Sequence, residues 1–250
     1  MFSGCSVLRN TAQGRRKIQR SAEFILGLPV LSRTRYSWCR VNALLLIDLQ
    51  NDFLPGGAIP VAHGDLVAPL ANQLQGAFKL VVATQDWHPA NHQSFASSHP
   101  GRKPGDTALL KKTRQTLWPV HCVQNTRGAE LSPALMLNRV NKIFRKGTEA
   151  DTDGHSAFFD DGHVRATGLH EYLQDKRVTD VYVMGLGTES CVKATALDAV
   201  ALGFKTFLIE DACRSLSLKP DTTKAAIDEL RQVGVTIIQS RDLLAIPVRN

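Results

Sequence analysis

Short, continuous apolar runs alternate along the chain with segments of helical spacing. The first run, 43–47, is apolar at every position, which is typical of a strand buried on both faces of a parallel sheet. In the segment 65–78, leucine and valine residues instead recur at the spacing of one helix face. The pattern predicts further strands at 80–84, 143–147, 181–184, 205–210 and 235–239, and helices near 132–137, 169–174, 191–202 and 222–233.

Strands that alternate with helices are typical of a parallel sheet covered by helices on both faces. We therefore predict an α/β fold: a doubly wound, mainly parallel sheet of about six strands in a three-layer, Rossmann-like arrangement. In a sheet of order 3-2-1-4-5-6, ligands bind beyond the carboxyl ends of the strands, where the order reverses between the first and fourth strands. Residues 41–250 are long enough to form one such domain.

Positive charge is concentrated at the start of the chain. The 250 residues have a formal net charge of +7, with 30 basic and 23 acidic side chains. Residues 1–40 hold eight Lys and Arg but a single acid, Glu23, so 22 basic and 22 acidic residues remain in 41–250. This neutral remainder argues against a nucleic-acid partner. We expect residues 1–40 to be a poorly ordered basic extension, either a transit peptide or, as we prefer, a segment upstream of the true start at Val41.

The five cysteines are scattered and form no paired motif, and no signal peptide precedes them. This pattern argues against a disulfide framework or a structural zinc module and favours a reducing compartment. No apolar stretch approaches the ~20 residues that cross a bilayer. We therefore expect a soluble, cytoplasmic protein without a membrane partner, or a mitochondrial one if the extension is a transit peptide. A homo-oligomer stays an open alternative.

A cysteine follows the predicted strand 181–184 at a glycine-rich junction. The junction is Gly185-Leu186-Gly187-Thr188-Glu189-Ser190-Cys191, and helical spacing begins directly after it. We expect Cys191 at a helix N-terminus, where backbone N–H groups and the helix dipole lower a thiol pKa from its usual ~8.5. The backbone N–H groups of Gly187 and Cys191 are placed to receive an oxyanion. The alternative is that Cys191 is a small buried apolar residue without a chemical role.

Two charged residues lie at the ends of other predicted strands. Asp48 ends the first strand and Lys146 the third, so a parallel sheet brings both near Cys191. A carboxylate can accept the thiol proton, and an ammonium stabilises both anions. The sequence thus predicts nucleophilic catalysis by these three residues. The alternatives are a loop-capping aspartate and a solvated lysine.

Potential metal ligands follow the second predicted strand. Asp86 and His88 are two positions apart and project to the same side of an extended chain, and His121 can return to them from the long segment 90–127. Two histidines and one carboxylate leave coordination positions open for water or substrate. Ser94 is placed to orient a metal-bound water. The competing histidines are His92, His99, His155 and His163.

Five motifs in collinear order resemble the nicotinamidases of the isochorismatase-like cysteine hydrolases. The motifs are IDLQNDF at 47–53, QDWHPANH at 85–92, WPVHC at 118–122, RKG at 145–147 and GLGTESCV at 185–192. The resemblance covers residues 42–240. It implies a single isochorismatase-like hydrolase domain that converts nicotinamide and water to nicotinate and ammonia through a cysteine thioester, in NAD salvage.

The resemblance also implies a role for single residues. The catalytic triad consists of Asp48, Lys146 and Cys191. One divalent metal ion (zinc, iron or manganese), which receives the pyridine nitrogen directly, is bound by Asp86, His88 and His121. The ring of nicotinamide is contacted by Phe53, Trp118 and His155. Ser94 and His92 are expected to lie behind the metal ligands and to orient them, without binding the metal themselves.

Three positions depart from the family pattern. Gly187 is usually alanine, Glu189 usually aspartate, and His155 often tyrosine. We expect these departures to affect loop geometry and substrate affinity but not the reaction type, because glycine keeps the N–H group while holding the oxyanion loop less rigidly. The alternatives to a nicotinamidase are another amidohydrolase of the superfamily that acts on a different small amide, and a catalytically silent binding module with the same fold.

Overall fold

Six parallel strands form the main sheet of this computed structural model, which describes residues 40–111, 113–216 and 220–244. The predicted extension therefore lies, apart from Arg40, outside the described residues. The strands are β1 (Val41–Ile47), β2 (Leu80–Asp86), β5 (Lys142–Lys146), β6 (Val178–Leu186), β7 (Lys205–Arg214) and β8 (Thr236–Ile238). They are arranged in the order β5-β2-β1-β6-β7-β8, and each neighbouring pair is parallel. The doubly wound sheet is confirmed, and its order reverses between β1 and β6.

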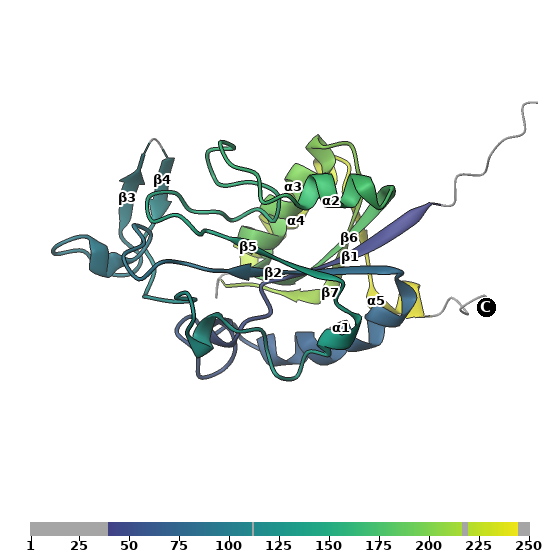
Figure 1. Ribbon diagram of the computed structural model, residues 1–250, viewed down its shortest axis with the longest axis horizontal. Helices are drawn as coiled ribbons and strands as arrows, with labels where there is room; N and C mark the ends of the chain where they lie inside the picture. The colour runs from purple at the N-terminus through teal and green to yellow at the C-terminus, as the bar shows by residue number, and fades with distance from the viewer. Residues whose placement is uncertain (1–39, 112, 217–219, 245–250) are drawn as a thin grey trace, which may run out of the picture. The chain divides into compact units, whose positions relative to one another are not determined.

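Helices cover both faces of this sheet (Figure 1). Helices α1 (Val67–Leu74) and α5 (Ser240–Leu244) lie on one face, where they contact each other and β7. The other face carries α2 (Leu169–Asp175), α3 (Lys193–Ala201) and α4 (Pro220–Gln232). The predicted three-layer arrangement is therefore confirmed. Among the described residues, no helix combines the length and the apolar character that crossing a membrane requires.

Strand β1 forms the centre of the core. Residues 43–47 are fully buried, since both faces of the sheet are covered by helices. Each buried Leu or Ile stabilises the fold by roughly 1.5–3 kcal/mol relative to an exposed position. Leu46 pairs with Ala83 of β2 and Met184 of β6. The end of β1, and with it Asp48, is thereby fixed at the point where the strand order reverses.

The helix predicted near 132–137 is wrong. This segment is irregular, and only a 3-10 turn, Leu137–Arg139, follows it. Two of its backbone N–H groups bond to distant partners instead of the carbonyl groups of a helix: Ser132 N–H donates to Leu49 O at 2.7 Å, and Met136 N–H donates to Asn72 Oδ1 at 2.8 Å. Tertiary contacts thus override the local apolar spacing.

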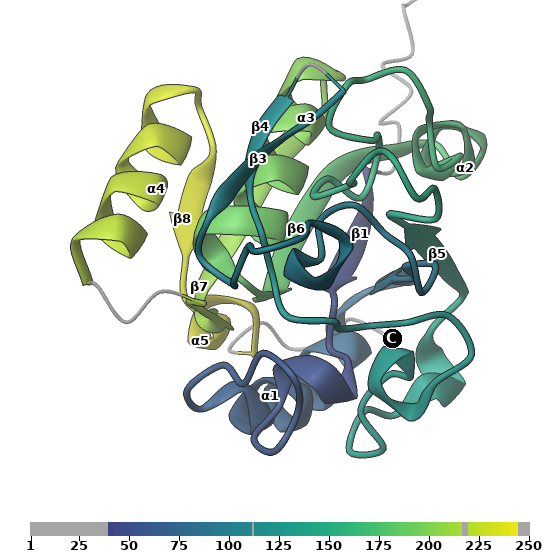
Figure 2. The ribbon, with the colours of Figure 1, turned by 90° about the vertical axis from the view of Figure 1, so that its left-hand side faces the viewer.

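The long segment 90–127 contains regular structure that the sequence did not predict. Strands β3 (Thr107–Leu110) and β4 (Thr113–Thr116) form a separate antiparallel hairpin. The hairpin lies at the left in Figure 1 and faces the viewer in Figure 2. Helix α5 was not predicted either, and the helix predicted over 65–78 is α-helical only in α1, with 3-10 turns on both sides.

Candidate active site

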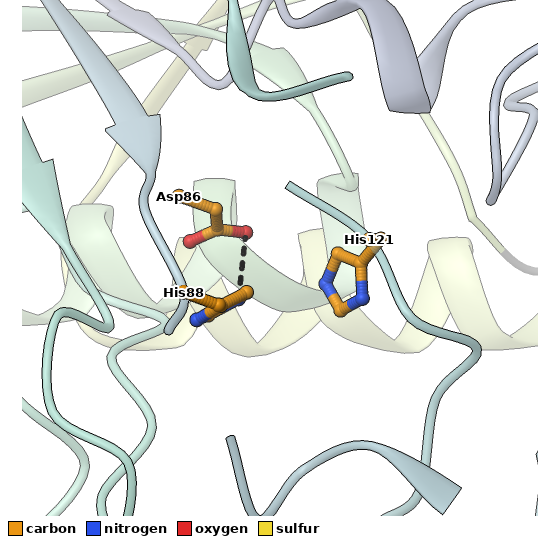
Figure 3. Close-up of side chains that lie close together, drawn as sticks. All are labelled: Asp86, His88 and His121. Carbon is orange, nitrogen blue, oxygen red and sulfur yellow. Dashed lines mark ion pairs between the residues drawn. The ribbon is translucent and has the colours of Figure 1, made fainter. Parts of the chain in front are cut away.

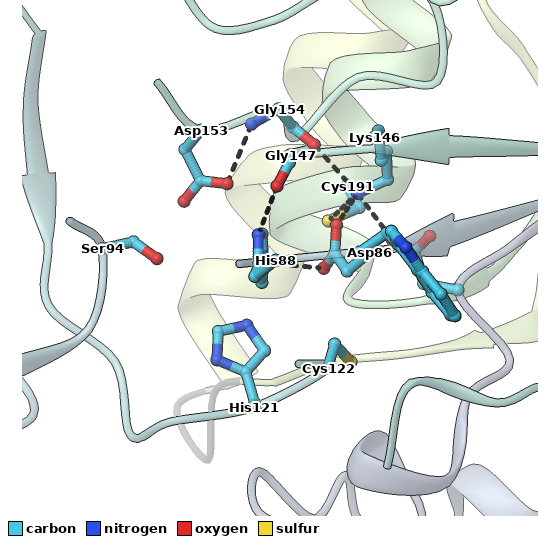
Figure 4. A network of polar contacts seen from close by, with 12 residues as sticks. Asp86, His88, Ser94, His121, Cys122, Lys146, Gly147, Asp153, Gly154 and Cys191 are labelled. Atoms are coloured by element: carbon cyan, nitrogen blue, oxygen red, sulfur yellow. Dashed lines mark hydrogen bonds and ion pairs between the residues drawn. The ribbon is translucent and has the colours of Figure 1, made fainter. Parts of the chain in front are cut away.

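Three side chains from three different segments meet where the strand order reverses. The Nζ atom of Lys146, the last residue of β5, lies 2.9 Å from Asp48 Oδ2 and 3.3 Å from Cys191 Sγ. Asp48, Lys146 and Cys191 are only 1%, 3% and 7% exposed. The structure thus brings the three predicted catalytic residues together in a buried cluster, part of which is shown in Figure 4.

Asp48 is held in a strained backbone conformation directly after β1. Its φ of 50° lies in the left-handed region, which costs a non-glycine residue about 1–3 kcal/mol. Thr84 of β2 stabilises this conformation twice: its hydroxyl accepts the N–H of Asp48 at 3.1 Å and donates to Asp48 Oδ1 at 2.6 Å. One carboxylate oxygen is thereby fixed by Thr84, while the other faces Lys146.

Lys146 is also paired with a second carboxylate. Because Lys146 and Asp86 are register partners on neighbouring strands, Nζ reaches Asp86 Oδ1 at 2.6 Å, and it also donates to Gly154 O at 3.0 Å. Burial alone lowers the pKa of the ammonium, but Asp48 and Asp86 outweigh burial and raise the pKa well above its usual value. Lys146 therefore stays protonated between the two carboxylates.

Cys191 lies in an irregular turn before α3 rather than inside the helix. Residues Thr188–Val192 form a single π-type turn in which Ser190 has non-helical angles, and α3 begins at Lys193. The predicted lowering of the thiol pKa is wrong. Burial raises the pKa of Cys191 well above its usual value, and Lys146 offsets only part of this effect. Formation of the thiolate thus needs a nearby proton acceptor, and burial also raises the pKa of Asp48, as a base requires.

Asp86, His88 and His121 converge beside this cluster, as Figure 3 shows. Their ligand atoms all lie within 4.8 Å of one another, and Asp86 Oδ2 is 3.9 Å from His88 Nε2. Nδ1–H of His88 donates to Gly147 O at 2.9 Å, and that of His121 donates to Pro119 O at 2.8 Å. Because Nδ1 is bonded to a carbonyl oxygen in both rings, Nε2 is the ring nitrogen that is left to bind a metal. Burial lowers the pKa of His88 to about 4, which keeps its ring neutral.

The close packing around His88 explains the glycine of the RKG motif. Gly147 has a φ of 61°, and a Cβ atom at this position would overlap with the His88 ring. On its other side, the His88 ring lies 4.3 Å from the ring of His92, measured between centroids. His92 in turn bonds through Nδ1 to Ser94 Oγ at 2.6 Å. His92 thus packs against a predicted metal ligand, and Ser94 contacts His92, while their role in supporting a metal stays a prediction.

The competing histidines are placed differently. Within the described ranges, neither His99 nor His163 belongs to a group of side chains that could hold a metal. His99 Nε2–H donates to Gln93 O at 2.7 Å, and His163 pairs with Asp198 on the surface at 2.9 Å. His92 does belong to an alternative group, together with His88 and Asp153, so the sequence interpretation of His92 as a competitor was reasonable.

A cleft opens between the nucleophile and the metal ligands. It is lined by the three predicted ring contacts, Phe53, Trp118 and His155, together with Cys191 and the metal ligands. His155 is fixed by Asp161, whose carboxylate accepts its Nδ1–H at 2.8 Å. Burial lowers the pKa of His155, but Asp153 and Asp161 outweigh burial and raise the pKa to about 9.

Sequence reasoning missed five further residues that line the cleft. They are Ile59, Asp153, Gly154, Ser190 and Leu216. Asp153 is buried, and its carboxylate accepts the N–H of Gly154 at 2.8 Å and a hydrogen bond from Gln115. Leu216 fills the space beside Gly187, where a Cβ atom would lie 2.6 Å from Leu216 Cδ1. No pattern in the sequence identifies these residues as part of a cleft, since each lies in an irregular connection.

Comparisons with known proteins agree with this geometry. Residues 42–242 match the family model of the isochorismatase domain. The nicotinamidase of Escherichia coli (strain K12) is 45% identical over 205 residues, which cover 80% of this chain and 96% of that relative.

Two solved structures extend the comparison. A nicotinamidase and pyrazinamidase of Acinetobacter baumanii has a TM-score of 0.79 and 47% sequence identity. The superposition covers 82% of this chain and 98% of the Acinetobacter chain. The pyrazinamidase of Pyrococcus horikoshii, solved in complex with zinc, has a TM-score of 0.64 and 39% identity, with coverage of 79% and 98%.

Proposed function

This chain belongs to the isochorismatase family, and from this premise we propose that it is a nicotinamidase, which hydrolyses nicotinamide to nicotinate and ammonia. The observation that carries this function is the contact of one buried ammonium, Lys146, with both Asp48 and Cys191, of which Cys191 lines the cleft. A thiol beside a carboxylate is suited to covalent hydrolysis of an amide. The aromatic side chains of Phe53 and Trp118 at the cleft are suited to a flat ring.

In the first half of the reaction, Asp48 accepts the proton of Cys191, and the thiolate attacks the carboxamide carbon. The backbone N–H groups of Gly187 and Cys191 stabilise the oxyanion that forms on the carbonyl oxygen. The C–N bond then breaks, and the proton held by Asp48 passes to the leaving nitrogen, so that ammonia departs and a thioester remains. Lys146 remains protonated throughout and stabilises the charges of Asp48 and Cys191.

In the second half, Asp48 accepts a proton from a water molecule that attacks the thioester carbonyl. The C–S bond breaks, nicotinic acid leaves and loses its proton to solvent as nicotinate, and the proton returns from Asp48 to the sulfur of Cys191. The same carboxylate thus serves both halves of the reaction, which its position beside both Lys146 and Cys191 permits.

The residues Asp86, His88 and His121 would hold one divalent metal ion, for which zinc, iron and manganese are candidates. Two imidazoles whose Nδ1–H groups are bonded to carbonyl oxygens, which leaves Nε2 as the ligand atom, and one carboxylate fit such an ion, and they leave positions open. A metal held by these residues would supply an open coordination position for the ring nitrogen of nicotinamide and would so orient the ring. The protein itself contributes Phe53 and Trp118 as contacts to the ring faces and His155 as a contact at the cleft wall.

An ammonia-release assay tests this function. We expect ammonia from nicotinamide in the presence of the metal, and little from other small amides. A higher rate with another amide would favour a different amidohydrolase of the family, and no ammonia from any amide would favour a silent binding module. The Cys191→Ala variant serves as the control. A role in NAD salvage and a cytoplasmic location are proposals that this assay does not address.

A further inference from the structure

Asp52 belongs neither to the triad nor to the metal ligands, yet it holds together the segments on one wall of the cleft. It lies in the 3-10 turn Asn51–Phe53, directly before the ring contact Phe53. Its Oδ2 atom accepts the N–H of Cys122 at 2.6 Å across 70 positions of sequence. Its backbone carbonyl accepts the N–H of Ile59, another residue of the cleft, at 2.8 Å.

The bond to Cys122 acts directly beside a metal ligand. Cys122 follows His121 and has a φ of 46°, a left-handed conformation that is unfavourable for a non-glycine residue. The Asp52 carboxylate stabilises this conformation by accepting the N–H of Cys122. On the other side, Pro119 O accepts Nδ1–H of the His121 ring at 2.8 Å. The two contacts together fix the backbone and the ring of His121, and hence the direction of its Nε2 atom.

The carboxylate of Asp52 also has little room to move. A Cβ atom at Gly128 would overlap with both carboxylate oxygens, so the backbone of the turn Arg127–Ala129 is packed directly against them. The neighbouring Asn51 bonds the same turn, because its Nδ2–H donates to Arg127 O at 2.8 Å. Asp52 is thus fixed by a contact that only glycine at position 128 permits.

We propose that Asp52 is a positioning residue of the metal site: its carboxylate joins the Phe53 turn to the His121–Cys122 segment, so that the metal ligand and the ring contact are set together. The centroids of the Phe53 and His121 rings are 5.7 Å apart, which places both beside the same ligand. This inference rests on the proposed metal site. Residues that orient a ligand in this way typically contribute about 10–100-fold to metal affinity or activity.

Zinc affinity of the full chain, measured by competition with a chromophoric chelator, tests the proposal. Asp52→Ala should weaken zinc binding about 10–100-fold, and Asp52→Asn, which keeps one acceptor oxygen, should weaken it less. The rate at which a small alkylating agent modifies Cys191 should stay within about twofold in both, because Asp52 does not contact the nucleophile. The matched control is Asp106→Asn, since Asp106 also accepts a backbone N–H, that of Lys103 at 3.0 Å, and does not line the cleft.

An Asp52→Ala protein that binds zinc as tightly as the wild type would overturn the proposal. If Asp52→Ala does not fold, Gly128→Ala provides the second test, because the added methyl group displaces the carboxylate while Asp52 itself is retained. Unchanged zinc affinity in Gly128→Ala, with the carboxylate displaced, would likewise contradict the proposed role. The titration contains no nicotinamide, so its result is independent of whether nicotinamide proves to be the substrate.

Discussion

The two sides of the cleft are built in different ways. Asp48 and Lys146 lie at or directly after strand ends, Cys191 lies in the turn that follows β6, and none of the three is more than 7% exposed. Phe53, Trp118, His121 and His155 lie in the segments that connect the regular elements, and the His155 side chain is 27% exposed. The first side is positioned by the parallel sheet itself, whereas the second depends on single hydrogen bonds such as that from Cys122 to Asp52. We call Asp48, Lys146 and Cys191 the strand side, and Phe53, Trp118, His121 and His155 the loop side. We expect changes to the strand side to abolish catalysis, and changes to the loop side to weaken the binding of nicotinamide.

The largest expected effect concerns the strand side. Replacing Cys191 by Ala, or Asp48 by Asn, should lower kcat at least about a thousandfold, because each change removes a step that no other residue supplies. The fold should be retained, since Lys146 keeps Asp86 as a partner at 2.6 Å in both variants. Steady-state ammonia release measures the loss, and circular dichroism checks the fold. Substantial activity in Cys191→Ala would exclude the thioester mechanism.

Changes to the loop side should weaken the binding of nicotinamide. Removal of the metal by a chelator, or His121→Ala, should weaken nicotinamide binding and turnover together, by about 10–100-fold. Benzamide lacks the ring nitrogen and should be a poor substrate with or without metal. Binding is measured by calorimetry with Cys191→Ala protein, and alkylation of the wild-type thiol should continue without metal, because the nucleophile is held by the strand side.

A matched control for this experiment is His99→Ala. His99 lies in the same connecting segment, but its Nε2–H bonds to Gln93 O at 2.7 Å, and it is not part of the metal group. We expect this variant to bind nicotinamide as the wild type does. If the metal-free enzyme binds nicotinamide as tightly as the metal-loaded enzyme, or hydrolyses benzamide as fast, the metal does not serve ring binding and the contrast between the two sides fails.

The same contrast separates what the sequence could predict from what it could not. The apolar run 43–47 predicts a strand, and any parallel sheet brings the ends of its strands together, so Asp48, Lys146 and Cys191 could be expected to meet. No spacing in the sequence, by contrast, indicates that Asp52 bonds to Cys122. Such contacts depend on how two irregular segments fold against each other.

Local reasoning also failed where the surroundings decide the outcome. The position of Cys191 before a helix predicts a lowered pKa, but the actual direction depends on burial and on charges from Lys146, Asp48 and Asp86, which lie in three other segments. The segment 132–137 has helical spacing, but the N–H groups of Ser132 and Met136 bond to Leu49 and Asn72. In both cases the deciding contacts come from residues distant in the sequence.

A smaller effect is expected from the charge of His155. Its pKa is about 9 in the folded protein, against an ordinary ~6.5 when unfolded, because Asp153 and Asp161 outweigh burial and the repulsion of Lys146. The stabilisation from this raised pKa is fully present below pH ~6.5 and is lost as the pH rises through 9. The pH-dependent part of the difference in unfolding free energy between wild type and His155→Gln should therefore be on the order of 3 kcal/mol below pH ~6.5 and vanish above 9.

Urea unfolding between pH 6 and 10 measures this difference. The matched control is His163→Gln, which removes another His–Asp pair, with Asp198, at a position where the histidine side chain is 60% exposed. Such exposed pairs contribute little to the free energy of unfolding, so the unfolding free energy of this variant should follow that of the wild type across the pH range. A constant difference between wild type and His155→Gln at every pH would show that the cleft histidine is not stabilised by its charge.

The smallest effect is expected from removal of the first 40 residues. Both sides of the cleft are complete in the described part of the chain after Arg40, and β1 begins at Val41, which pairs with Val178. The deletion removes one ion pair in the described residues, between Arg40 and Asp180 at 3.8 Å, and Arg40 is 71% exposed there. A surface pair of this kind contributes about 0–1 kcal/mol. A chain that starts with Met in place of Val41 should therefore melt within a few degrees of the full chain and turn over nicotinamide within about twofold. A much larger fall in Tm or in kcat/KM would show that the extension packs against the domain, and the sequence prediction of a dispensable segment would then be wrong.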